Sequence, residues 1–391
     1  MAAAYLWQYQ QSFSSMLFSE ITGQEYLKGR LVRTVQENRV SHAWLFFGPE
    51  GAGALPLAVA FARYILCTGR GLTDACGTCA SCSKINKYIH PDLHFTFPVN
   101  KTRSLDKDAV VSDDFIADWR NFMLQQPYGR LTQWYDLIDL ENKQGIINTD
   151  ESKRLAYKLN LKSFESDYKV AVIWQPEKMN DQAANKLLKL LEEPPSMTVF
   201  ILVAGNPEQL LPTVRSRCVH VKVPQIGDHE LEQALVEKHG IEKGRVAGMV
   251  RLASGNYLKA LELITEAEDF RFNFNNFRDL MRVCFKKNIP GMVKISEELA
   301  TLTRERQKAF LEYGLGTIRE SLALHFNTVD IVYITDEEQD FIPKFAPYVT
   351  GDNVVILTRE LTQAIQDIER NANGRIVFLD LVLKLASLIK I

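Results

Sequence analysis

The chain of 391 residues is 46% hydrophobic and 24% charged, a composition typical of a soluble globular protein with two to four domains. Its formal net charge of −2 excludes the overall basic field with which many proteins attract nucleic acid, so a DNA contact would need a local patch or basic partners. No run of 18 or more apolar residues is present, and the sequence therefore predicts no membrane-spanning helix.

The first 15 residues are rich in Ala, Gln and Ser and have no basic start, so they are not typical of a signal peptide. We expect residues 1–15 to be a disordered tail. The folded pattern begins at Phe18, and Met16 is an alternative start of translation.

A glycine-rich turn follows the apolar run Trp44–Phe47 and precedes a helical pattern, which is the layout of the phosphate-binding loop G-x-x-x-x-G-K-[ST]. Ala54 replaces the lysine that reaches the phosphates, and Leu55 replaces the hydroxyl residue that holds magnesium. The loop thus keeps its shape without its reactive groups. The loop glycines are Gly48, Gly51 and Gly53.

Four of the six cysteines lie close together, and their spacing indicates a structural zinc site. They favour a reducing compartment and a metal over disulfides. The alternatives are four free thiols or a catalytic dithiol, which four clustered cysteines would overfill. We expect this module to span residues 67–90 and to end at the sequence His-Pro-Asp. The four candidate ligands are Cys67, Cys76, Cys79 and Cys82.

A second catalytic position also lacks its usual residues. The buried strand expected at Lys169–Ile173 should end, in an ATPase of this layout, in an acidic pair that holds magnesium and polarises water. Trp174 and Gln175 follow it instead. A chance mismatch would explain either loss alone, but the two together favour an inactive site.

Further strands are expected at Leu93–Val99, Thr198–Val203 and Val219–Val223, and a helix at Asp181–Leu191. Residues 100–145 are charged and aromatic, and we interpret them as an insertion of mixed helix and loop without an assigned function.

Taken in order, these motifs resemble those of bacterial clamp-loader AAA+ subunits of DNA polymerase III. The resemblance is strongest over residues 18–100 and 150–265. It is carried by the degenerate phosphate loop, the four-cysteine insert, His90-Pro91-Asp92, Leu187–Pro195 (LLKLLEEPP) and Ser216-Arg217-Cys218.

The resemblance implies an α/β AAA+ fold, with a RecA-like parallel five-stranded sheet and helices on both faces. A four-cysteine zinc module, a small helical lid and an all-α collar that joins subunits into a ring complete the expected architecture. Its expected bounds are an AAA+ domain at 16–223, a lid at 224–265 and a collar at 266–391. In the collar, helices are expected at 270–287, 290–302, 304–326, 354–371 and 375–391.

The resemblance also implies a role for Arg217, within Ser216-Arg217-Cys218, as an arginine finger that reaches the ATP of a neighbouring subunit. A guanidinium offers a fixed fork of donors to a phosphoryl group in transfer. The alternative is a surface arginine in a local ion pair. Two sensor positions of the family hold Ala204-Gly205 and Leu258, neither of which offers a polar side chain.

We therefore expect a non-catalytic, stator-like subunit of the polymerase III holoenzyme, cytoplasmic and near the nucleoid. Its pocket would not bind magnesium-ATP, or would hold nucleotide only passively through loop N–H groups. The implied partners are gamma or tau, delta, the sliding clamp beta and, through the assembly, primed DNA. The alternatives are an active ATPase of gamma/tau type and a stand-alone zinc-bearing DNA-binding module.

Overall fold

The structure, a computed structural model, describes residues 16–389 apart from 104, 106, 108, 141–142 and 327–337, and leaves the side chains of 243–245 undescribed. The tail expected at 1–15 lies outside the described residues. The chain divides into two compact units, one ending at Thr265 and the other beginning at Glu266. Each unit is described by itself below.

The first unit contains a sheet of five parallel strands in the order β2-β3-β4-β1-β5. This confirms the predicted five-stranded parallel sheet. β2 ends three residues before the expected Val99, because Pro98 has no N–H to donate to a sheet. The strands are β1 (Ala43–Phe47), β2 (Leu93–Thr96), β3 (Lys169–Trp174), β4 (Thr198–Ala204) and β5 (Val219–Lys222).

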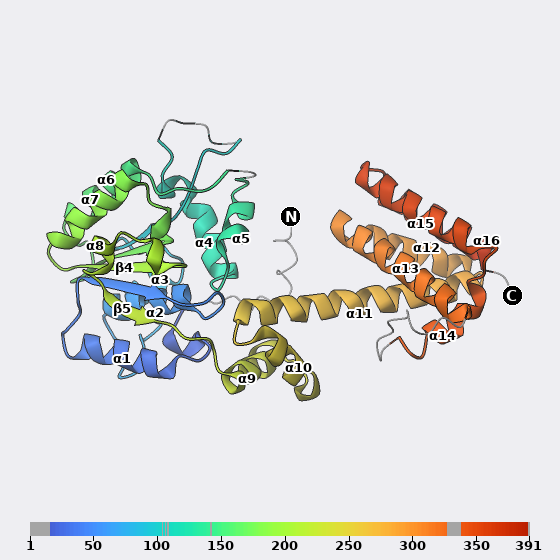
Figure 1. Cartoon of the computed structure of the whole chain (residues 1–391), viewed down its shortest axis with the longest axis horizontal. Coiled ribbons are helices and arrows are strands. Elements are labelled where there is room, and N and C mark those ends of the chain that lie inside the picture. Colours follow the sequence, from blue (N-terminus) through green and yellow to red (C-terminus); the bar gives the residue numbers. More distant parts are fainter. Residues whose placement is uncertain are drawn as a thin grey trace. The chain divides into compact units, whose positions relative to one another are not determined.

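Helices cover both faces of the sheet, as predicted (Figure 1). Alternate strand residues face opposite sides. Trp44 and Phe46 belong to the core beneath α1 (Glu25–Gln36) and α2 (Ala54–Leu66). Ala43 and Leu45 belong to the second core, together with leucines of α6 (Thr149–Asn160) and α7 (Asp181–Glu192).

The remaining elements of the first unit are short, apart from the helices that follow β5. The helices are α3 (Ala80–Ile85), α4 (Ile116–Gln125), α5 (Leu131–Leu137), α8 (Pro212–Arg215), α9 (Asp228–His239) and α10 (Lys243–Ala253). The 3-10 turns are η2 (Phe18–Glu20), η3 (Ser112–Phe115), η4 (Pro176–Lys178) and η5 (Pro207–Gln209).

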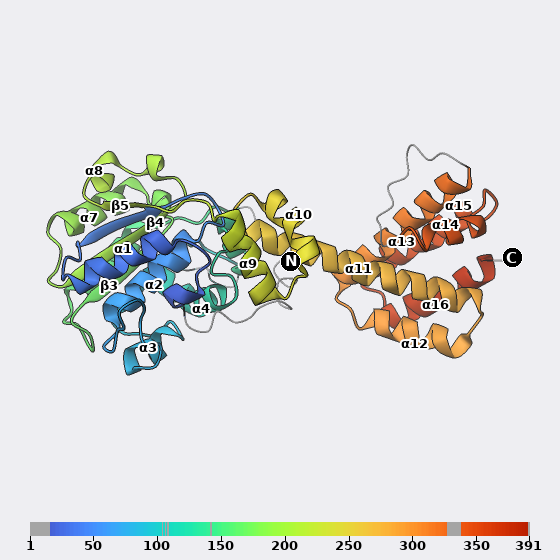
Figure 2. The same cartoon turned by 90° about the horizontal axis from the view of Figure 1, so that it is seen from below.

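One helix differs from the expectation. The lid was expected to end at 265 and a separate collar helix to span 270–287, but α11 runs without a break over Tyr257–Phe285 (Figure 2). The connecting residues, Glu266–Asp269, include neither Gly nor Pro, so nothing in them ends a helix. The lid and the collar expected from the sequence therefore share this helix.

The second unit consists of helices around its own core, which draws its buried residues from Phe277 to Ile389. No helix within the described part of the chain is long and apolar enough to cross a membrane. Beyond α11 the elements are α12 (Ile289–Ala300), α13 (Arg304–His325), α14 (Ile342–Phe345), η7 (Ala346–Tyr348), α15 (Val354–Glu369) and α16 (Gly374–Leu388).

Candidate functional site

The phosphate loop lies between β1 and α2, at the carboxyl edge of the parallel sheet, where such folds bind ligands. It lines a cavity of about 270 Å³. The opposite side of the cavity is formed by Trp174 and Gln175 at the end of β3 and by Ala204-Gly205 at the end of β4. The structure therefore brings together the positions that the sequence identified as altered.

The loop glycines are required by close packing within this chain. Gly53 has a φ of +91°, and a Cβ there would lie 2.9 Å from the ring of Tyr128. A Cβ at Gly48 would lie 2.2 Å from the carbonyl oxygen of Val223. The loop shape is thus maintained by contacts that involve no phosphate.

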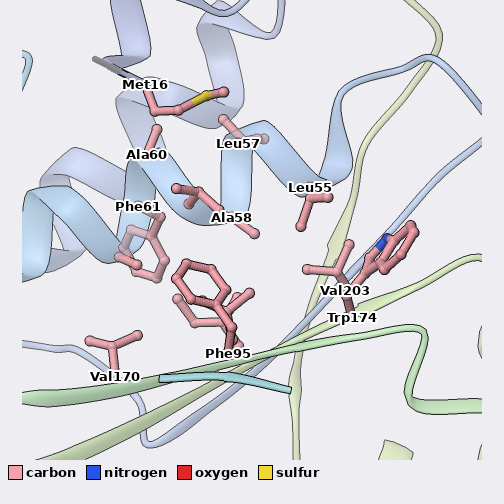
Figure 3. Packing of buried hydrophobic residues seen from close by; sticks show 14 of the residues in the cluster. Met16, Leu55, Leu57, Ala58, Ala60, Phe61, Phe95, Val170, Trp174 and Val203 are labelled. Carbon is pink, nitrogen blue, oxygen red and sulfur yellow. The ribbon is translucent and has the colours of Figure 1, made fainter. Parts of the chain in front are cut away.

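The two residues at the expected magnesium position form an apolar contact region. Leu55 at the start of α2 is directed toward Val203 and Trp174, at the ends of β4 and β3 (Figure 3). Leu55 is 5% exposed and Trp174 is 3% exposed. Neither side chain offers an oxygen ligand for a hard cation such as magnesium.

An aromatic cluster extends this apolar region into the insertion at 100–145. Trp119 of α4 stacks on Phe97 with ring centroids 4.3 Å apart, and its ring lies 5.3 Å from that of Trp174. Trp134 of α5 packs edge-on against Trp119 at 5.4 Å. Trp174 thus gives the inserted helix α4 an aromatic surface to pack on.

The link between these helices, residues 127–131, lines the cavity beside the loop glycines. The Tyr128 hydroxyl accepts a hydrogen bond from the N–H of Thr22 at 3.1 Å, and burial raises the pKa of Tyr128 to about 12. Its ring centroid lies 4.6 Å from that of Tyr257. A segment without an assigned function in the sequence thus forms part of the pocket.

The pocket has one positive side chain among its lining residues, Arg130, and this side chain is already paired. The Arg130 Nη2 atom lies 2.6 Å from Glu262, and its Nε atom lies 3.5 Å from Glu50. Sequence reasoning missed Arg130 because it follows no motif. The turn-forming residues Pro127 and Gly129 were the available signal that this segment bends.

The residues at the two expected sensor positions, Ala204-Gly205 and Leu258, take part in packing and in local hydrogen bonds. Leu258 is buried. Gly205 and Asn206 donate their backbone N–H groups to one oxygen of Glu177, at 2.7 and 2.9 Å. Burial raises the pKa of Glu177. These hydrogen bonds stabilise the turn after β4. Ala204, which ends that strand, has no polar side chain that could contact a phosphate.

The four predicted metal ligands do meet. Their Sγ atoms all lie within 4.8 Å of one another, and three of the separations are 3.6, 3.6 and 3.9 Å. A zinc ion with bonds of about 2.3 Å to four tetrahedral sulfurs would place the sulfurs roughly 3.8 Å apart. The residues therefore fit a tetrahedral metal site, formed by Cys67, Cys76, Cys79 and Cys82.

Backbone N–H groups point at these sulfurs. Cys76 donates to the sulfur of Cys67 at 3.4 Å, and Cys79 donates to that of Cys76 at 3.3 Å. Cys82 donates to the sulfur of Cys79 at 3.4 Å. Such bonds stabilise thiolates, the form in which cysteine binds metal.

The four thiols have different pKa values. Burial raises the pKa of Cys82 to about 12 and also raises that of Cys67. Backbone N–H groups lower the pKa of Cys76. Burial acts to raise the pKa of Cys79, but hydrogen bonds, chiefly from Thr68, lower it to about 5. A metal ion would therefore have to release protons from the two more buried thiols.

The residues His90-Pro91-Asp92, at the end of the four-cysteine module, form hydrogen bonds that hold the chain between this module and β3. The Asp92 carboxylate accepts the backbone N–H groups of residues 164–166, at distances of 2.6 to 3.0 Å. His90 accepts the N–H of Asp92 through Nδ1 at 3.1 Å. This motif anchors the loop before β3 to the start of β2.

The Ser216–Cys218 corner follows α8 and does not line the cavity. Arg217 is exposed, its Nη2 lies 2.8 Å from Glu192, and its Nη1 donates to the carbonyl of Thr213 at 2.9 Å. Burial raises the pKa of Cys218 to about 12. The predicted site residues thus lie in three places: the phosphate loop, the cysteine cluster and this corner.

Comparison with known proteins gives the family. The chain is 24% identical over 357 residues to DNA polymerase III subunit delta-prime of Bacillus subtilis, covering 91% of this chain and 94% of the relative. It is 31% identical over 189 residues to delta-prime of Pseudomonas aeruginosa, covering 48% and 44%. DNA polymerase III subunit tau of Bacillus subtilis is 24% identical over 276 residues, 69% of this chain and 41% of tau.

A solved structure of a DNA polymerase III gamma-subunit-related protein from Thermotoga maritima covers 94% of this chain and 100% of its own, at 14% identity and a TM-score of 0.34. This likeness is too weak to add to the assignment. The family described as DNA polymerase III, delta subunit, matches residues 23–227, which is more than half of the chain. The chain therefore belongs to the DNA polymerase III delta-subunit family, as a delta-prime-like clamp-loader subunit.

Proposed function

We propose that this protein is the non-catalytic subunit of a DNA polymerase III clamp loader. It acts by assembling with the gamma or tau ATPase and with delta, and the assembly places the sliding clamp on primed DNA in the cytoplasm. The observation that carries the proposal is the altered pocket, in which Leu55 and Trp174 replace the magnesium-binding side chains. Subunits of gamma/tau type are among the chain's relatives.

Hydrolysis of ATP in this pocket lacks its chemical requirements. Phosphoryl transfer needs positive charge on the β- and γ-phosphates and a metal ion held by oxygen ligands. Among the described residues, Arg130 is the single cation that lines the cavity, and it is paired with two carboxylates.

The proposed contribution of the chain to catalysis is Arg217, offered in trans to the ATP of a neighbouring gamma or tau subunit. Its place in the Ser216-Arg217-Cys218 motif supports this proposal. The side chain is exposed, and its ion pair with Glu192, which a surface arginine would also make, contributes at most about 1 kcal/mol. Exchange of this carboxylate for the phosphates of a neighbour therefore costs little. Arginine fingers contribute about 10³–10⁵ in rate.

The test is the ATPase rate of an assembly reconstituted from this chain, gamma or tau, and delta. Arg217→Ala should lower the rate of ATP turnover at sites next to this chain, while the assembly still forms on size exclusion. Arg215→Ala is the matched control, because Arg215 lies two residues away and pairs with Glu208 instead. Equal rates for the wild type and Arg217→Ala would remove the finger assignment.

The same experiment includes the chain alone. We expect no ATP turnover above background from it, and turnover clearly above background by the isolated chain would favour an active gamma/tau-type enzyme.

The cysteine cluster is proposed to hold one structural zinc ion, which would connect the end of α2 to α3. Tight, salt-sensitive DNA binding by the isolated chain would contradict a role limited to assembly.

A further inference from the structure

Arg63 is a fully buried cation without a carboxylate partner. It lies in the last turn of α2, and its side chain has no exposed surface. Nη2 donates to the carbonyl oxygen of Cys82 at 3.3 Å and to the amide oxygen of Asn86. Nε and Nη1 have no hydrogen-bond partner, and no salt bridge of Arg63 occurs among the residues that the structure describes.

Such an arrangement is unfavourable by itself. A buried guanidinium needs a compensating charge, because two neutral oxygen acceptors do not replace the water that it gives up. The carboxyl end of α2 carries a partial negative charge, but this effect is smaller than the cost of full burial. The environment must therefore supply an anion that belongs to the folded, functional protein.

The cysteine cluster is the anion within reach. Cys67 follows Arg63 by four residues, one helical turn, at the end of the same helix. Cys82 contributes both a candidate ligand sulfur and the carbonyl that Arg63 binds. Four thiolates around one Zn²⁺ have a net charge of −2, and a single neighbouring cation halves it.

We propose that Arg63 is the buried counter-cation of a zinc–tetrathiolate centre, and that it stabilises the metal-bound state by its charge. The inference rests on the zinc site proposed above. It makes the contribution of Arg63 depend on the metal. Arg63 stabilises the protein when zinc and four thiolates are present, and this stabilisation is lost when the metal is removed.

The first test is zinc affinity, measured on the full chain by competition with a chromophoric chelator. Arg63→Met keeps most of the side-chain volume and removes the charge, and should weaken zinc binding by about 10- to 100-fold, the usual effect of losing an outer-shell partner. Arg63→Lys keeps the charge and should recover most of that loss. Asn86→Ala removes the hydrogen bond but not the charge, and should leave affinity within about threefold.

The second test is the sign of the stability change. With zinc bound, Arg63→Met should lower the urea midpoint relative to wild type; after chelation it should equal or exceed the wild-type midpoint. Arg33→Met is the matched control, because Arg33 also ends a helix but is exposed. Its midpoint should match wild type in both states.

Several outcomes would overturn the inference. Equal destabilisation by Arg63→Met with and without zinc would make Arg63 a packing residue. A loss of affinity in Asn86→Ala well beyond about threefold would assign the effect to hydrogen bonding, and this measurement against wild type can be made even if Arg63→Met does not fold. Wild-type protein that purifies without metal and binds none would remove the zinc site itself, and would leave the proposed role in the clamp loader unchanged.

Discussion

The ion pair between Arg217 and Glu192 connects two motifs that are separate in the sequence. Glu192 ends α7 in the LLKLLEEPP segment, and Arg217 follows α8. In the lone chain they lie 2.8 Å apart, with about two fifths of each side chain exposed. If Arg217 acts on a neighbour's ATP, this carboxylate competes with the phosphates for the same guanidinium.

Glu192→Gln should therefore favour the finger. The amide keeps the shape of the side chain but removes the charge that holds Arg217. Because exposed pairs contribute at most about 1 kcal/mol, the stimulated ATPase rate of the reconstituted assembly should rise by up to roughly fivefold. The control is Glu193→Gln, at the adjacent exposed position. A rate that falls with Glu192→Gln would show that the carboxylate positions the finger instead of restraining it.

Two half-buried histidines, His94 and His239, predict how stability depends on pH. Burial, assisted by Lys158 near His94 and by Lys238 near His239, lowers the pKa of each imidazole to about 4. The unfolded chain has a histidine pKa near 6.5 and so binds these protons at higher pH than the folded chain does. Stability is therefore complete above pH 6.5 and declines as pH falls toward 4, by up to about 1.4 kcal/mol per pH unit for each group.

Urea unfolding of the zinc-loaded protein at pH 7.5 and 5.5 would measure this loss. Replacing both histidines, as His94→Gln and His239→Gln together, should reduce the difference in unfolding free energy between the two pH values. Loss of zinc at low pH contributes equally to both proteins and is removed by the comparison. An unchanged difference would show that the two imidazoles do not titrate upon unfolding.

At the scale of elements, the aromatic cluster around Trp119 holds the inserted helices α4 and α5 against the sheet. Trp119 contacts Phe97, Trp134 and Trp174, and its side chain is fully buried. Trp119→Ala should cost about 3–5 kcal/mol of unfolding free energy, the usual range for removing a buried large aromatic side chain. The measurement is urea unfolding followed by far-UV circular dichroism.

The control for this variant is Tyr157→Ala. Tyr157 is an aromatic residue on α6 with 63% of its surface exposed, and its loss should change stability by less than about 0.5 kcal/mol. Similar losses of unfolding free energy in Trp119→Ala and Tyr157→Ala would show that the packing of the aromatic cluster does not stabilise the fold.

Strands β1, β3 and β4 could be predicted from the sequence because each is a short apolar run with both faces buried. The edge strand β5 has only Val221 buried, and its alternating pattern was the available signal. The altered loop positions could be recognised from the sequence because the phosphate-loop motif assigns a chemical role to each position, and the loss of catalysis stays a prediction. The place of residues 127–131 could not, since Tyr128 is held by Thr22 and Tyr257, which lie more than 100 residues away on either side. Local periodicity carries no information about such partners.

The same limit applies to Arg63 and Arg217. Arg63 occupies an ordinary position in an apolar helix, and only the fold shows that its guanidinium is buried against the cysteine module. Arg217 could be selected by its motif, but its proposed target lies in another chain. The four cysteines were the opposite case, because their spacing alone indicated that the sulfurs would meet.

At the scale of the whole molecule, the described residues form separate cores. The core that includes Cys67 and Cys82 also includes α1, α2 and strand residues, all within 16–223. The core of the second unit draws its buried residues from 277–389. Loss of the metal should therefore be felt within the first unit and not throughout the chain.

Hydrogen exchange with and without a chelator would test this separation. Zinc removal should increase amide exchange in α2 and α3, because Cys67 ends the first helix and Cys79 caps the second, and a bound metal would fix both ends. Amides of α12, α13, α15 and α16 should keep their protection, and adding zinc back should restore the original pattern. A parallel loss of protection in both units would mean that they unfold as one cooperative body, and would require coupling along α11, the helix that runs from the first unit into the second.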